Sequence, residues 1–286
     1  MRKAALLYFV FILSACAPAV VQTSTPLPKA TDTATSTPTP NPSPTFTITP
    51  TPAPNGPCDN PLVPLVIGNQ WKYRVTTESG EKEYNLKVLE RRDSGNILML
   101  VEFGDQDTTV QERVVCLNGA IEGFPLFVMD MLFADRLNKF MNTYHDTGLY
   151  APSHASLAEK GWVLDCKVFY LTEEGAQIKN PNGPPDLLIG PSSPINILFH
   201  MDGSQEAVTV PAGEFPQALN VTHNFTLSAT LGSYGGHLTL ETTQWYEPYV
   251  GLVRAQLDSA SYTMGGPRLS VPMKSILELV EFTPGN

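Results

Sequence analysis

The stretch that decides the fold is Leu219-Asn220-Val221-Thr222-His223-Asn224-Phe225-Thr226-Leu227-Ser228-Ala229-Thr230-Leu231. Its odd-numbered positions are apolar apart from one histidine, and its even-numbered positions are all Asn, Thr or Ser. Because successive side chains of a strand point to opposite faces of a sheet, this alternation predicts an antiparallel strand with one buried and one solvated face. A strand of 13 residues is more than twice the usual length, which favours a strongly curved sheet or an open barrel.

The residues that follow predict a hairpin partner for this strand. We expect Gly232-Ser233-Tyr234-Gly235-Gly236 to turn the chain into a second strand over 237–246. This turn would place Phe225 opposite Gln244 on the apolar face. The side chains on that face are the candidates for lining a ligand site: Phe225, Leu227, Leu238, Leu240 and Tyr246.

Alternation bounded by turn residues recurs along the rest of the chain. It predicts nine further strands, at 71–77, 84–92, 97–103, 109–117, 162–171, 195–201, 207–210, 251–263 and 269–282. Residues 125–145 fit both a helix and a buried strand, with helix favoured, and the proline-rich residues 180–194 predict a long loop. The predicted fold class is mainly β, a strongly curved antiparallel sheet or open barrel with at most one or two short helices.

The amino terminus has the pattern of a targeting segment. Arg2 and Lys3 precede an apolar stretch at 4–12, which is too short for a membrane-spanning helix of about 20 residues. The next four residues, Leu13-Ser14-Ala15-Cys16, resemble the bacterial lipobox. This resemblance implies that residues 1–15 are a signal peptide and that Cys16 carries the lipid that anchors the protein to a membrane. An ordinary secretory signal with an incidental cysteine and a short anchor helix are the alternatives.

Residues 16–57 predict a tether rather than a folded domain. Positions 22–57 contain 11 Thr and 10 Pro, a composition that favours extended polyproline conformation and could span about 110 Å. The remaining domain, 58–286, has 15 basic and 27 acidic residues, a formal charge of −12. This charge excludes a nucleic-acid partner. The predicted location is extracytoplasmic, at the cell surface or in the periplasm.

Three short phrases in the domain resemble a group of bacterial envelope proteins. They are Gly68-Asn69-Gln70-Trp71-Lys72-Tyr73, Val210-Pro211-Ala212-Gly213-Glu214-Phe215 and Trp245-Tyr246-Glu247-Pro248-Tyr249-Val250-Gly251-Leu252-Val253. The group is similar to the LolA-like lipoprotein-carrier fold. The resemblance implies a curved antiparallel sheet around an apolar cavity, closed by helices or loops. Only a short helical candidate is present in this chain, so a deep lipid cavity does not follow from the resemblance.

Three cysteines follow the lipobox cysteine. The start of the first strand and the end of the fourth lie at the same end of an up-and-down meander, so this geometry favours a Cys58–Cys116 disulfide. Cys166 alternates with apolar neighbours and is expected to be a buried thiol.

The sequence contains no nucleophile elbow, phosphate-binding loop or dinucleotide motif. A metal site at His145 and His154 is conceivable but lacks ligand spacing, and His223 is expected to be a core histidine. We therefore expect no catalytic residue, no metal and no cofactor.

The leading hypothesis is a non-catalytic lipoprotein that binds an apolar or amphiphilic ligand, such as a lipid, in its curved sheet. A structural or assembly module that binds an envelope protein is the alternative, and a hydrolase acting on wall polymer is the least favoured.

Overall fold

The computed structural model describes residues 58, 60–94, 96–117, 119–122, 127–133, 136, 143–147, 149–151, 162–170, 176–179, 185–190, 193–201, 204–266 and 268–285. All of them belong to one compact unit, which comprises residues 44–286. In the described part of the chain, no helix is long and apolar enough to span a membrane.

The first part of this unit is an antiparallel meander. Its strands are β1 (Gln70–Thr77), β2 (Gly80–Ser94), β3 (Asn96–Gly104), β4 (Thr109–Leu117) and β5 (Ala120–Glu122). Each strand pairs with the next one along the chain, as the alternating pattern predicts. Trp71, Tyr73 and Val75 of β1 are buried in alternation, so the period-two pattern places one face of this meander in the core.

The described elements in the middle part of the chain are short, apart from the nine-residue strand Trp162–Tyr170. They are α1 (Phe127–Leu132), β6 (Thr143–Thr147), β7 (Leu149–Ala151), β8 (Trp162–Tyr170), β9 (Ala176–Ile178) and β10 (Leu187–Ile189). Two of these findings correct the predictions. Among the described residues of the segment 125–145, helix covers Phe127–Leu132, and the end of the segment belongs to the strand Thr143–Thr147. The predicted loop 180–194 contains β10 and the beginning of the next strand, because β10 pairs with β9 and with a long strand of the sheet.

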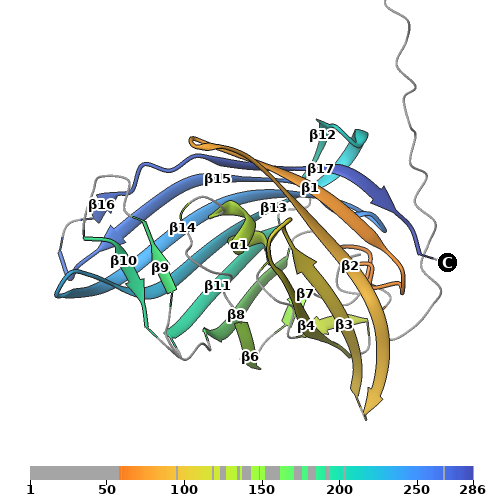
Figure 1. Cartoon of the computed structure of the whole chain (residues 1–286), viewed down its shortest axis with the longest axis horizontal. Helices are drawn as coiled ribbons and strands as arrows, with labels where there is room; N and C mark the ends of the chain where they lie inside the picture. The colour runs from red at the N-terminus through yellow and green to blue at the C-terminus, as the bar shows by residue number, and fades with distance from the viewer. Residues whose placement is uncertain are drawn as a thin grey trace, which may run out of the picture. The chain divides into compact units, whose positions relative to one another are not determined.

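The last part of the chain contains the longest strands. They are β11 (Ser193–Met201), β12 (Gln205–Val210), β13 (Gly213–Leu231), β14 (Tyr234–Glu247), β15 (Gly251–Thr263), β16 (Arg268–Ser270) and β17 (Ser275–Thr283). Strand β17 pairs with β1 on one side and with β15 on the other, so both parts belong to one antiparallel sheet. The sheet is strongly curled (Figure 1), which confirms the predicted fold class.

The β13–β14 hairpin forms as predicted but in a different register. The turn has two residues, Gly232 and Ser233, and the ladder begins at Leu231 opposite Tyr234. Gly232 has a φ of 62°, which suits the first position of a tight hairpin turn. Phe225 therefore lies opposite Leu240, not Gln244. The five-residue turn was wrong because Gly235 and Gly236 continue the ladder as strand residues.

The core lies on the concave face of the sheet. The aromatic rings of Tyr84, Phe103 and Phe127 stack in series, with centroids 5.6 Å and 4.4 Å apart. Because Phe127 belongs to α1, this stack fixes the helix against the inner face of β2 and β3. The outer face of β13 carries Asn224, Thr226 and their polar neighbours, which are partly or fully solvated.

Candidate functional site

The concave face of the sheet is occupied by a segment that precedes the first strand. This segment, residues 60–66, is called the plug below, and its residues 60–65 are all buried. Pro61 and Pro64 have no backbone N–H, so the plug cannot form a regular ladder with a neighbouring strand. Leu62, Val63 and Leu65 fill part of the space between the sheet and α1.

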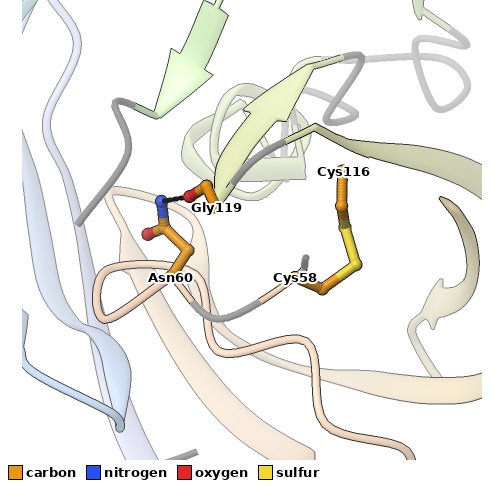
Figure 2. The surroundings of a disulfide bond; sticks show 4 residues. All are labelled: Cys58, Asn60, Cys116 and Gly119. Carbon is orange, nitrogen blue, oxygen red and sulfur yellow. Dashed lines mark hydrogen bonds between the residues drawn. A yellow bond between two sulfur atoms is a disulfide. The ribbon is translucent and has the colours of Figure 1, made fainter. Parts of the chain in front are cut away.

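Polar contacts at Asn60 fix the beginning of the plug. The Oδ1 atom of Asn60 accepts hydrogen bonds from the backbone N–H groups of Leu62 (3.0 Å) and Val63 (3.1 Å). Its Nδ2 atom donates to the carbonyl oxygen of Gly119 at 3.0 Å (Figure 2). Asparagine is suited to this place, because its short side chain can bond the backbone two or three residues further on.

A disulfide joins Cys58 to Cys116 beside this asparagine (Figure 2), and the two Cα atoms are 5.1 Å apart. Cys116 lies in β4, so the bond connects the chain that enters the plug to the amino-terminal meander. The bond closes a loop of 58 residues in sequence. It also lies between the predicted tether and the plug, so it fixes the end of the plug to the sheet.

The first and third of the phrases from the sequence meet against the plug. Trp71 donates through Nε1 to the carbonyl oxygen of Val250 at 2.5 Å, and the Tyr73 hydroxyl donates to the carbonyl oxygen of Leu252 at 3.1 Å. Gly251 has a φ of 95°, and a Cβ atom there would lie 3.3 Å from Cδ of Pro64. These two sequence segments therefore form the β14–β15 turn and the surface against which the plug packs.

A small cavity remains between the plug, α1 and the sheet. Its volume is about 40 Å³, and its lining residues are uncharged. The plug contributes residues 62–65, and the helix contributes Phe127, Val128 and Met131. About 10–15 Å³ of such space is enough for one water molecule, so the cavity has room for a few waters, whereas ligand pockets usually measure about 300–1,000 Å³. An acyl chain could therefore enter only if the plug moved.

A row of polar side chains lies on the inner face of β14, next to this cavity. Thr242 and Gln244 are buried, and Gln244 donates through Nε2 to the Thr242 hydroxyl at 3.2 Å. The Tyr246 hydroxyl donates to Oε1 of Gln244 at 2.7 Å, and Tyr246 also lines the cavity. His223 stacks on Tyr246 and on Phe225, and burial lowers the pKa of His223 to about 3. This row brings four polar side chains together on one part of the inner face.

The five candidate lining residues of the sequence are brought together on this inner face. Phe225 pairs with Leu240, and Leu227 pairs with Leu238. All four are buried in the core, and only Tyr246 of the five lines the cavity. Sequence reasoning missed the plug, although the apolar run Pro61-Leu62-Val63-Pro64-Leu65-Val66 just before the first strand is a visible signal for it.

Other candidate residues have structural places or fall outside the description. Cys16 and His154 are outside the described residues, and the side chains of His145 and Cys166 are not described. Asp105 accepts hydrogen bonds from the backbone N–H groups of Asp107 and Thr108, as expected for a residue in a turn. In the part of the chain that the structure describes, no three His, Cys, Asp or Glu side chains are grouped to hold a metal ion.

Comparison with known proteins gives two solved structures of similar fold. One is a Bacteroides fragilis protein with a YmcC-like fold, inferred to be exported, with a TM-score of 0.46 and 13% identity. The other is from Parabacteroides distasonis and inferred to be a lipoprotein, with a TM-score of 0.45 and 15% identity. Each likeness covers 78% of this chain and 99% of the other chain. No family model matches the chain, and no curated protein matches it.

Proposed function

We propose that this chain is a membrane-anchored extracytoplasmic lipoprotein that binds one apolar or amphiphilic ligand without catalysis. In this proposal residues 1–15 are the signal peptide, 16–57 are the lipidated cysteine and tether, and 58–286 are the binding domain of LolA-like type.

The anchor is supported by Leu13-Ser14-Ala15-Cys16 behind a short apolar stretch. Metabolic labelling with an alkyne-bearing palmitate tests it: the full chain should take up label, and Cys16→Ser should not. Equal labelling of both would contradict the anchor.

The observation that carries ligand binding is that the sheet does not fill its own concave face. Two inserted elements, the plug and α1, supply much of the apolar surface there, and a cavity still remains. The polar row at Gln244 and Tyr246 would give the head group of an amphiphile hydrogen-bonding partners beside that apolar space.

Exchange of the plug for a ligand is energetically balanced only if the ligand is itself apolar. Burial of Leu62, Val63 and Leu65 contributes about 1.5–3 kcal/mol each, or roughly 5–9 kcal/mol together. A buried methylene contributes about 0.8 kcal/mol, so on the order of ten methylenes would offset this loss. A single acyl chain meets that requirement.

Photo-crosslinking in living cells tests ligand binding. A diazirine-bearing palmitic acid should label residues on the inner face, in peptides that contain Trp71 or Tyr246, because both side chains line the cavity. Val101→Phe narrows the cavity from the sheet side and should lower this labelling severalfold. Leu198→Phe is the matched control, since Leu198 is 45% exposed, and it should change nothing. Absence of label from the inner face would contradict ligand binding.

A second candidate function is the assembly module, which binds an envelope protein. The filled interior and the exposed apolar side chains of Leu198 and Ile276 favour it. A photoreactive amino acid at position 198 or 276 should then crosslink a defined envelope protein in cells, and the reverse crosslink from that protein should recover this chain. If both positions crosslink only lipid or nothing, the assembly function is wrong.

A further inference from the structure

We infer that the plug, residues 60–66, occupies the place of the ligand, and that the Cys58–Cys116 disulfide controls its exchange for an acyl chain. The inference rests on the proposed ligand-binding function and adds a regulation to the same site. It follows from the chemistry of the plug, from the way in which its ends are held, and from the position of the disulfide.

The plug matches an acyl chain in size and chemistry. Residues 61–66 are six consecutive apolar residues, which can span at most about 20 Å. One acyl chain reaches through half of a hydrocarbon core about 30 Å thick, or about 15 Å. Removing the plug would therefore join the present cavity to a trough long enough for one such chain. Trp71, Tyr73 and Tyr246 would then line the trough, as they line the cavity now.

The middle of the plug is held by side-chain packing and a few isolated hydrogen bonds. The strands around it are held by regular backbone pairing. The backbone N–H of Tyr249 donates to the carbonyl oxygen of Pro61 at 2.8 Å. Asn69 donates through Nδ2 to the carbonyl oxygen of Pro64 at 2.7 Å. Strand β1 instead pairs along its whole length with β2 and with β17, with one irregularity in the β17 ladder between Lys72 and Tyr73. The plug can therefore leave the sheet without breaking a ladder.

The two ends of the plug are fixed in different ways. At the carboxyl end, Gly68 and Asn69 exchange backbone hydrogen bonds with Val88, and the Asn69 side chain accepts one from Gly285. These bonds tie that end to β2 and to the carboxyl terminus. At the amino end, the covalent tie is the disulfide to β4. Opening the disulfide would therefore remove the covalent tie at the amino end. The hydrogen bonds of Asn60 to Gly119 and of Tyr249 to Pro61 would then be the remaining ties there, and the carboxyl end would act as the hinge.

The redox step is an ordinary thiol–disulfide exchange. A dithiol reductant of thioredoxin type donates two electrons and two protons, the bond between the Cys58 and Cys116 sulfur atoms breaks, and the two cysteines become thiols. The reductant is oxidised to its own disulfide. In an oxidising extracytoplasmic compartment the disulfide persists until such a reductant acts.

The test compares the oxidised and the reduced full-length lipoprotein in lipid nanodiscs. The probe is diazirine-bearing palmitic acid, and mass spectrometry measures the label on the β1 and β14 peptides. We expect at least tenfold more label after reduction. The double variant Cys58→Ser/Cys116→Ser should take up as much label as the reduced natural chain, whether or not reductant is present. Cys166→Ser, which keeps the disulfide, should respond to reductant as the natural chain does.

A second variant and a second measurement separate opening of the plug from unfolding. Leu62→Ala leaves the disulfide in place but weakens the plug, so its oxidised form should already take up severalfold more label. Hydrogen exchange after reduction should rise in residues 60–66 and stay unchanged in β13 and β14. A rise over the whole sheet would overturn the inference. Equal labelling of oxidised and reduced protein would overturn the disulfide control and leave ligand binding standing. No label in any form would overturn both.

Discussion

At the scale of single residues, His223 makes the stability of the protein dependent on pH. Burial lowers its pKa to about 3 in the folded state, whereas an unfolded histidine has a pKa of about 6.5. Between these values the unfolded chain binds the proton and the folded chain does not. The free energy of unfolding should therefore fall by about 1.4 kcal/mol for each pH unit below about 6. Urea denaturation at several pH values between 4 and 7 measures this slope.

The matched pair of variants for this prediction lies on one hairpin. His223→Leu removes the buried imidazole, so the dependence on pH between 4 and 6 should become shallower by about that amount. His237→Leu replaces an exposed histidine of β14 and should retain the full slope. An unchanged slope in His223→Leu would show that other groups cause the acid sensitivity.

The indole N–H of Trp71 should contribute to the free energy of unfolding of the protein. Its Nε1 atom donates to the carbonyl oxygen of buried Val250, and Trp71→Phe would leave that carbonyl without this donor. An unsatisfied buried polar group costs about 1–3 kcal/mol, which is the expected loss in the free energy of unfolding. Trp245→Phe is the control. Trp245 donates to the carboxylate of exposed Glu206, which water can solvate instead, so its hydrogen bond should matter less. Equal losses in the two variants would contradict this explanation.

At the scale of elements, the sequence predicts long strands better than short ones. The strands β13 and β1–β4 can be recognised from sequence, because each contains many positions at which apolar and polar side chains alternate. The five three-residue strands, such as β5 and β10, carry too few alternations to be recognised. Strands β5, β10 and β16 each pair with a long strand, whereas β7 and β9 pair with the short strands β5 and β10. For β10 the long strand is β13, a contact that no local pattern encodes.

The candidate site was predicted only in part, for a related reason. Phe225 and Tyr246 were placed on the correct face by alternation, since the period of two fixes which side chains point inward. Which of them borders the cavity depends on the plug and on α1, whose positions are set by tertiary contacts such as the Phe103–Phe127 stack. An irregular segment with two prolines has no period from which to predict its place.

The register of the β13–β14 hairpin gives a sharp test with two adjacent glycines. A Cβ atom at Gly236 would overlap the carbonyl oxygen of Thr263 on β15, whereas a Cβ atom at Gly235 would meet nothing within 4 Å. Gly236→Ala should therefore lower the free energy of unfolding by about 1–3 kcal/mol. Gly235→Ala should stay within about 0.5 kcal/mol of the natural chain. Urea denaturation of both variants measures the difference, and the reverse order would show that the hairpin has another register.

At the scale of the whole domain, β17 decides whether the sheet unfolds as one unit. The amino-terminal strands and the long carboxyl-terminal hairpins meet along this strand, between β1 and β15. Leu277 lies opposite Val75 on one side and Ala255 on the other, and all three side chains are fully buried. Removing apolar volume at this position should therefore weaken both parts of the sheet together.

Leu277→Ala should lower the free energy of unfolding by about 2–5 kcal/mol, the usual cost of a large-to-small change in a core. Ile276→Ala changes the adjacent, 37% exposed side chain and should cost less than about 1 kcal/mol. Hydrogen exchange measured by mass spectrometry can follow the β2–β4 and β13–β14 peptides separately in each variant. Because both parts share β17, Leu277→Ala should shift the unfolding midpoint of both groups of peptides equally. If only one group shifts, the two parts of the sheet are independent folding units, and the continuity through β17 does not couple them.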